Sequence, residues 1–264
     1  GAIRQQVSRD ALSDVESPKA THEVLVALTK RMDQRREQAL VGLASDLVRE
    51  ENGRVVVVRF EEVPDQAPLT EDVAVQSTAD RSFERRIEAL GEEFDVDVEA
   101  DEIVSHDTKH AVVNFAADRG VDSIVAEHEP LRLRSRLIGD PIDWIVRHAP
   151  CDVLLVDNLG YDGPQQVSLS GGGGPYPPLA VDVAGAIAAA NGGDVSLRYP
   201  PGRNPTDKYE RTIDEYQSEL SDLLAVPVRT EPFRPDGGQR TSPELVVRRG
   251  TDSGLHGLLF DDRP

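Results

Sequence analysis

One group of residues has the type and the spacing that anion binding requires. It is the glycine run Gly171, Gly172, Gly173 and Gly174, which lies between an expected strand and an expected helix. Backbone N–H groups in such a turn can cradle a phosphate or a carboxylate. The run lacks the lysine of a P-loop and the spacing of the dinucleotide fingerprint, so we favour a flexible strand-to-helix turn over an anion site.

A second group could bind a metal. His106 and His110 stand at positions i and i+4 near an expected helix start, a geometry that can hold zinc. No third ligand has a matching spacing except Asp107, which is needed as the helix cap, so we expect no metal site. We find no Ser-His-Asp order, nucleophile elbow or paired-carboxylate motif, and therefore predict that the chain is not an enzyme. The single cysteine, Cys151, excludes an internal disulfide and is expected to be a packed thiol.

The elements that would position these residues alternate between strand and helix. Apolar runs predict strands at 22–28, 55–60, 96–104, 123–126 and 153–156. Apolar residues at spacings of three and four predict helices at 33–51 and 83–94, a third helix capped by Asp107, and a fourth at 141–147. This alternation predicts an α/β fold, a Rossmann-like, doubly wound parallel sheet of about five strands, because parallel neighbours need crossover connections.

The pattern then partly repeats after a shift of 140 residues, which places Gly53 on Gly193 and Val55 on Val195. The second copy is expected to contain strands at 167–170, 226–230 and 258–260, a helix whose apolar stripe runs from Tyr209 to Leu223, and a short helix at 242–249. Counterparts of 141–147 and 153–156 are missing, so we interpret this copy as truncated. The strand at 153–156 should then have an exposed edge, which we expect a second chain or the segment 158–166 to cover.

The boundaries that follow are a tail at 1–21, a first domain at 22–158, a linker at 159–166 and a truncated second domain at 167–264. The chain begins with Gly1 rather than Met, which leaves open that it is a fragment of a longer protein. No apolar run is long enough for a membrane span and no signal peptide is evident, so we expect a cytoplasmic location.

The net charge of the chain limits the classes of partner that it can bind. With 48 Asp and Glu against 29 Lys and Arg, the formal net charge is −19, which argues against nucleic acid because a phosphate backbone would be repelled. Only 4 of the 29 basic residues are Lys. An acidic surface with so little Lys is favoured in molar salt, and we expect a halophilic source.

Three motifs resemble the universal stress protein family: ADRGVDSIVAEHEP from Ala117, LIGD from Leu137 and RHAPCDVLLV from Arg147. The resemblance covers 22–158 well and 167–260 only in its first half, and it implies a tandem arrangement of the adenine nucleotide alpha hydrolase-like fold. The stretch VVVVRFEEVPDQAPL from Val55 is similar to the stress-protein domains fused to amino-acid permeases of the polyamine and cationic amino-acid superfamily. Members of the family commonly dimerise through their last strands, which implies a homodimer.

The resemblance places a nucleotide site at the ends of the first and fourth strands, in the region of Ala27, Thr29 and Glu127. Family members that bind ATP carry a Gly-x-x-Gly turn there, but the two glycines align with Glu127 and Pro130. The later Gly-Ser or Gly-Thr pair aligns with Gly139 and Asp140. Asp140-Pro141 is a self-contained helix start that puts a carboxylate where a phosphate would bind, so we predict that triphosphate binding is lost.

Three arginines keep nucleotide binding open as an alternative. Arg132, Arg134 and Arg136 could restore a phosphate site, although they could also pair with nearby acids. The preferred hypothesis is a non-catalytic cytosolic regulatory or assembly domain of a membrane amino-acid transporter, with the permease domain as partner in the same parent chain. It would have no cofactor, although ATP or AMP stays open as a regulatory ligand. The alternative is a stand-alone tandem universal stress protein that binds ATP or AMP, and an enzyme on the same fold ranks third.

Overall fold

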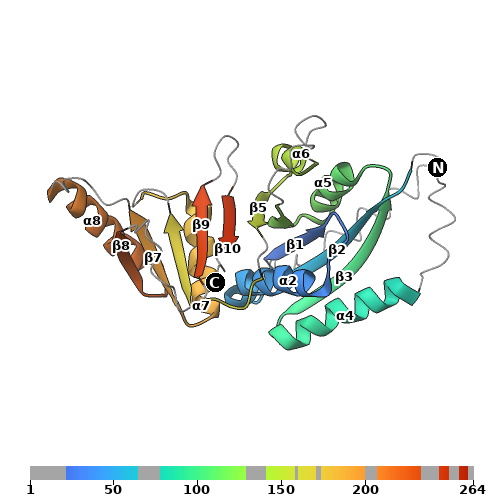
Figure 1. Ribbon diagram of the computed structural model, residues 1–264, viewed down its shortest axis with the longest axis horizontal. Helices are drawn as coiled ribbons and strands as arrows, with labels where there is room; N and C mark the ends of the chain where they lie inside the picture. The colour runs from blue at the N-terminus through green and yellow to red at the C-terminus, as the bar shows by residue number, and fades with distance from the viewer. Residues whose placement is uncertain are drawn as a thin grey trace, which may run out of the picture.

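The computed structural model describes residues 22–64, 78–128, 141–157, 160–170, 174–199, 207–232, 244–249 and 256–260. Their strands form one sheet in the order β3-β2-β1-β4-β5-β10-β9-β6-β7-β8. Figure 1 shows this sheet running from β3 on the right to β8 on the left. We call β1 to β5 the first half and β6 to β10 the second half.

The first half is the expected parallel α/β sheet, in which β1 pairs with β2 and β4, β2 with β3, and β4 with β5. Its elements are β1 (Glu23–Leu28), α2 (Gln34–Val48), η1 (Arg49–Glu51), β2 (Arg54–Glu62), α4 (Thr78–Phe94), β3 (Asp97–Ser105), α5 (Thr108–Arg119), β4 (Ser123–Glu127), α6 (Pro141–His148) and β5 (Asp152–Asp157). The predicted strands and helices of this half are confirmed. Asp33 and Asp107 cap α2 and α5 by accepting hydrogen bonds from backbone N–H groups three residues later.

Alternation along the strands divides the core of this half into two layers. Val24 and Val26 face α2 and α4, whereas Leu25 and Ala27 face the layer that contains α5 and α6. Both faces of the first sheet are therefore covered by helices, as a parallel sheet requires.

The second half consists of β6 (Gln166–Ser170), α7 (Pro178–Ala190), β7 (Asp194–Tyr199), α8 (Asp207–Leu223), β8 (Val228–Pro232), β9 (Glu244–Arg249) and β10 (His256–Phe260). Helix α7 packs against α2, so one apolar cluster extends from Val24 in the first half to Val228 in the second. The described helices of the second half, α7 and α8, join the same layer as α2 and α4.

Three sequence expectations for the second half are wrong. The segment 242–249 is not a helix, because Glu244–Arg249 forms β9, between β6 and β10. The fifth strand is not missing, because the strand predicted at 258–260 is β10, which completes the order β8-β7-β6-β9-β10. Leu223 does not belong to the buried stripe of α8, because it is 70% exposed.

The edge of β5 is therefore not open. Strand β10 pairs with it in parallel, His256 opposite Leu154, and pairs with β9 in antiparallel fashion. Only residues 250–255 join β9 to β10, too few for the dozen or more residues of a parallel crossover, so β10 must return beside β9 in the opposite direction. Neither a second chain nor the segment 158–166 is needed to cover β5.

Candidate functional site

The strand order places a topological switch point at the carboxyl ends of β1 and β4. From β1 the chain crosses to β2 and β3 on one side, and β4 and β5 lie on the other, so the order reverses between β1 and β4. Ligands of open α/β sheets bind at such a switch point. The structure brings together Ala27, Thr29 and Glu127 here, since Ala27 pairs with Ala126 in the β1–β4 register.

The switch point is occupied by a group of three charged side chains, Lys30, Arg36 and Glu127, which we call the Glu127 ion group. The Glu127 side chain is only 3% exposed, and its Oε2 lies 3.2 Å from Lys30 Nζ and 2.6 Å from Arg36 Nη2. Arg36 Nε also donates to Glu127 Oε1 at 2.9 Å. Lys30 follows β1, and Arg36 lies in the first turn of α2, where Asp33 accepts from its backbone N–H.

This arrangement holds an anion of its own at the switch point. A buried carboxylate is stable only when it is paired, and Glu127 is paired with two cations. The same two cations are the groups that a phosphate there would need, and an incoming phosphate would meet the Glu127 charge. At the switch point the two cations are thus paired with the chain's own carboxylate.

A second pair lies at the same edge, one strand further along. His128 follows β4 directly, and its Nδ1 lies 2.7 Å from Oδ1 of Asp157, the last residue of β5. The backbone N–H of His128 donates to the Val156 carbonyl at 2.8 Å. This pair is not among the residues predicted from the sequence, although His128 and Asp157 are polar residues at the carboxyl ends of two parallel neighbouring strands.

The second half has a corresponding position after β6, and an aromatic pair fills it. The Tyr176 hydroxyl lies 2.9 Å from the Leu169 carbonyl and 3.1 Å from the Arg198 carbonyl, between the ends of β6 and β7. The backbone N–H of Tyr176 donates to the Tyr216 hydroxyl at 2.9 Å. Gly174 has φ +98°, and a Cβ there would lie 2.4 Å from the Tyr216 ring. The last glycine of the run is thus required by the close approach of Tyr216.

Several residues proposed from the sequence lie outside the described residues: Arg132, Arg134, Arg136, Gly139, Asp140, Gly171, Gly172 and Gly173. Helix α6 begins at Pro141, as the Asp-Pro pair predicts. Within the described ranges, no three His, Cys, Asp or Glu side chains are grouped to hold a metal ion. Of the two histidines considered as zinc ligands, His106 has its Nδ1 3.2 Å from the Val63 carbonyl.

The single cysteine, Cys151, is half-buried, and burial raises the pKa of its thiol to about 11.

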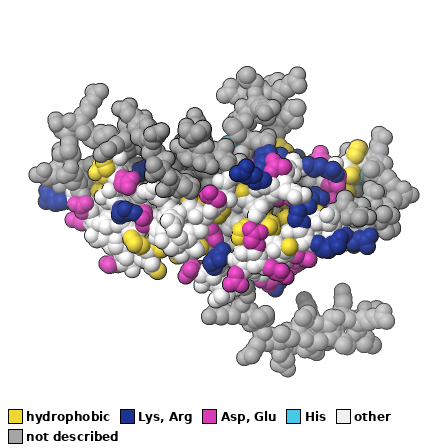
Figure 2. Space-filling view, turned by 60° about the horizontal axis from the view of Figure 1, so that its bottom comes forward, with side chains coloured by type: hydrophobic (Ala, Val, Ile, Leu, Met, Phe, Trp, Pro, Cys, Tyr) yellow, Lys and Arg dark blue, Asp and Glu magenta, His cyan; other side chains and the backbone are white. Residues whose placement is uncertain are grey.

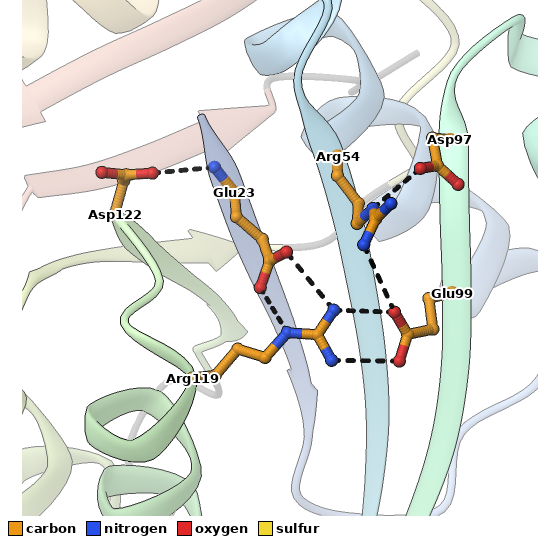
Figure 3. Close-up of polar contacts among 6 residues, drawn as sticks. All are labelled: Glu23, Arg54, Asp97, Glu99, Arg119 and Asp122. Atoms are coloured by element: carbon orange, nitrogen blue, oxygen red, sulfur yellow. Dashed lines mark hydrogen bonds and ion pairs between the residues drawn. The ribbon is translucent and has the colours of Figure 1, made fainter. Parts of the chain in front are cut away.

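The opposite edge of the first sheet carries a different ion network, shown in Figure 3. Its members are Glu23, Arg54, Asp97, Glu99, Arg119 and Asp122. Arg119 of α5 donates to Glu23 Oε1 at 2.7 Å and to Glu99 Oε2 at 2.7 Å, and Arg54 donates to Asp97 Oδ2 at 2.7 Å. Its hydrogen bonds with Arg119 hold the pKa of Glu99 below its usual range. Because these residues lie at the amino ends of the strands, the network stabilises the fold and is not part of the switch point.

Neighbouring opposite charges are not confined to this network. Figure 2 shows Asp and Glu side chains beside Lys and Arg over the first half, on the face turned to the viewer.

In the part of the chain that the structure describes, no helix has the length and the apolar character to cross a membrane.

Comparisons with known proteins agree with this architecture. The model of the Universal stress protein family matches residues 21–157. A solved universal stress protein from Pseudomonas aeruginosa is 15% identical, with a TM-score of 0.50 over 81% of this chain and 75% of that chain. A universal stress protein from Archaeoglobus fulgidus in complex with dAMP is 16% identical, with a TM-score of 0.37 over 50% of this chain and 95% of that chain.

A universal stress protein in complex with cAMP is 21% identical, with a TM-score of 0.37 over 53% of this chain and 99% of that chain. No curated protein sequence matches the chain. At these identities the similarity to solved structures concerns the fold.

Proposed function

The chain belongs to the universal stress protein family, and we propose that it serves as a non-catalytic cytosolic regulatory or assembly domain of a membrane amino-acid transporter. In this proposal the second half is a modified second unit of the same fold. The nucleotide site of the first half is closed by the chain's own carboxylate, so the domain acts through contacts with its partners.

The observation that carries the proposal is the Glu127 ion group. A carboxylate with 3% exposure lies at the switch point, and both nearby cations, Lys30 and Arg36, are engaged with it. A phosphate would have to take the two cations away from the buried Glu127 carboxylate. Leaving a buried charge without its partner costs about 3–5 kcal/mol. This cost favours an empty or internally filled site over a nucleotide sensor.

The test is calorimetric titration of ATP, ADP and AMP into the folded chain in molar KCl. We expect no saturable binding to the wild type. The variant E127G, which restores the glycine of the family's phosphate turn, removes the internal anion and should bind at least one of the three nucleotides. Circular dichroism of both proteins in the same buffer shows whether they are folded. Saturable binding to the wild type would contradict a closed site.

The transporter part of the proposal is supported by the resemblance of Val55–Leu69 to permease-fused stress-protein domains. Its test is the genomic reading frame upstream of residue 1. About a dozen apolar spans in the same frame, each of about 20 residues, would support it. A start codon close to residue 1 would contradict it and leave the proposal of a closed nucleotide site untouched.

One observation favours a second candidate, a stand-alone universal stress protein that binds AMP or ATP. Two cations, Lys30 and Arg36, lie at the switch point, where ligands of open α/β sheets bind. The same titration separates the candidates, because wild-type binding that is lost in both K30A and R36A would establish a working phosphate site.

A further inference from the structure

A cluster of aromatic and titratable side chains lies where α6 packs against α5, away from the switch point. Trp144 of α6 is in contact with two histidines. His148, four residues later on the same helix, stacks on the indole with ring centroids 4.0 Å apart and an interplanar angle of 13°. His110 of α5 contacts the same indole, with centroids 4.2 Å apart and a tilt of 47°. The three rings join the two helices.

The hydrogen bonds of the two histidines fix which nitrogen can accept a proton. His148 Nδ1 lies 2.7 Å from the Trp144 carbonyl, and His110 Nδ1 lies 2.9 Å from Asp107 Oδ2. A carbonyl and a carboxylate can only accept, so both Nδ1 atoms carry hydrogen. In each ring the additional proton must then go to Nε2, which creates an imidazolium in contact with the indole.

We propose that His110, Trp144 and His148 form a pH-dependent clamp, in which protonation of the two imidazoles tightens α6 against α5. A cation over an indole face is attracted by the quadrupole of the ring, whereas a neutral imidazole lacks this attraction. Imidazoles ordinarily change charge between pH 8 and 5, within the range that a cytoplasm can reach. The clamp is therefore tight on the acid side of this range and loose on the alkaline side.

The carboxylate of Asp107 favours the charged form of His110, whereas Lys109 and Arg147, the sequence neighbours of the two histidines, oppose a further positive charge. On α5, Asp107 faces His110, and Lys109 Nζ lies 3.4 Å from the same carboxylate. Burial opposes ionisation of Asp107, but hydrogen bonds from His110 and Lys109 outweigh it and lower the pKa of that carboxyl. From β2, Glu62 accepts a bond from the first backbone N–H of α5 at 3.4 Å.

On α6, His148 is the last residue of the helix, where the macrodipole favours a positive charge. Asp143 and Arg147 flank the aromatic pair in sequence and carry opposite charges. Ile142 and Ile145 anchor α6 in the apolar layer that it shares with α5. The contacts of Trp144 add to this anchor, so a change in their strength alters how tightly α6, the helix that leads from β4 to β5, is held against α5.

The test uses the emission of Trp144, which is the only tryptophan of the chain. A protonated imidazole in contact with an indole quenches its fluorescence. At constant ionic strength in molar KCl, we expect the emission of the wild type to fall about two-fold from pH 8 to pH 5 in a sigmoidal titration. The double variant H110Q/H148Q should show a flat profile, and each single variant a reduced amplitude.

Two matched controls separate the clamp from general acid effects. The variants H22Q and H128Q remove histidines elsewhere in the chain and should leave the titration unchanged. Thermal unfolding gives a second measurement. As pH rises from 5.5 to 8, the Tm of the wild type should fall by more than the Tm of H110Q/H148Q. A flat wild-type emission profile, or a full titration in the double variant, would overturn the proposal.

Discussion

The two halves of the molecule share a strand order but differ in what covers their sheets. In the first half, Leu25, Val56 and Val58 are buried on the face that α5 and α6 cover. After the shift of 140 residues, Val56 and Val58 correspond to Ser196 and Arg198 in the second half, where the described helices cover only the other face. The comparison shows that the two faces of a parallel strand need not be alike. The residue types on each face match the layer that packs against that face.

The connections explain why the halves differ. Between β4 and β5 the chain has room for α6, so β5 returns parallel to β4. Between β9 and β10 it has only residues 250–255, so β10 is antiparallel to β9 and runs parallel to β5. With this short connection, β10 runs antiparallel to β9 and links the two halves by pairing with β5.

The largest effect on stability should come from exchanging the side chains of one matched pair of positions, Val56 in the first half and Ser196 in the second. In V56S a fully buried apolar side chain of the first sheet becomes a hydroxyl, and we expect the free energy of unfolding to fall by about 3 kcal/mol. In S196V the hydroxyl removed is buried and has no hydrogen-bond partner among the described residues. We expect that variant to change stability by less than about 1 kcal/mol.

Urea denaturation of both variants, followed by circular dichroism in molar KCl, checks this pair. Equal losses in V56S and S196V would mean that the two faces have the same environment.

The next effect concerns the contact between the halves. The carboxylate of Asp46 in α2 accepts hydrogen bonds from Tyr161 and, at 2.8 Å, from Asn191 of the second half, and it pairs with Arg49 at 2.9 Å. Burial and the Asp46 charge raise the pKa of Tyr161, so its hydroxyl stays protonated as the donor. We expect D46A to lose about 2–3 kcal/mol, because it leaves Arg49 and Asn191 without this acceptor.

Differential scanning calorimetry of D46A measures this loss and shows whether the halves still unfold together. D214A, on a helix of the second half away from this contact, serves as the control. Unchanged stability and a single transition in D46A would show that the apolar contact of α2 with α7 suffices.

A smaller effect belongs to the network in Figure 3, whose position in the second half holds an ion pair between Arg229 and Asp194. Because the pKa of Glu99 is lowered in the folded state, its ionisation stabilises the fold above its ordinary value of 4.5, and this contribution is lost as pH falls further. Glu99 is 43% exposed, so we expect R119A to cost no more than about 1 kcal/mol at pH 7. Urea denaturation at pH 7 and pH 3.5 should show the difference from wild type shrinking at acid pH.

The smallest effect tests the helix of the second half whose buried stripe the sequence overestimated. L223A removes a side chain that is 70% exposed and should change stability by less than about 0.5 kcal/mol. L220A, one turn earlier and only 4% exposed, should cost about 2–3 kcal/mol. Comparable losses in the two would restore Leu223 to the buried stripe.

The sequence predicts most of the fold because most of it is encoded locally. Apolar runs such as 55–58 and caps such as Asp33 and Asp107 act within a few residues, so the strands of the first half and the starts of α2 and α5 are placed correctly, whereas α4 begins five residues earlier than predicted. The β9 strand was misread because Glu244–Arg249 is short and polar at both ends, and only its neighbours β6 and β10 decide its conformation.

The site is predicted less completely, for a related reason. The sequence indicates that Glu127 puts a negative charge where a phosphate would lie, but not that Lys30 and Arg36 neutralise it. Arg36 is 91 residues away along the chain, and the pairing depends on the side-by-side placement of β1 and β4. The role of Gly174 is equally non-local, since Tyr216 belongs to α8.

The pairing of β10 with β5 also has a consequence for how the protein is made. The strands of the first half lie close together in sequence and can assemble while the second half is still being synthesised. The neighbour of β5 arrives about 100 residues later, because His256 pairs with Leu154. During that interval the nascent chain carries an apolar strand with an unpaired edge, so the slowest and most aggregation-prone step of biogenesis is expected to be the closure of β5 by β10.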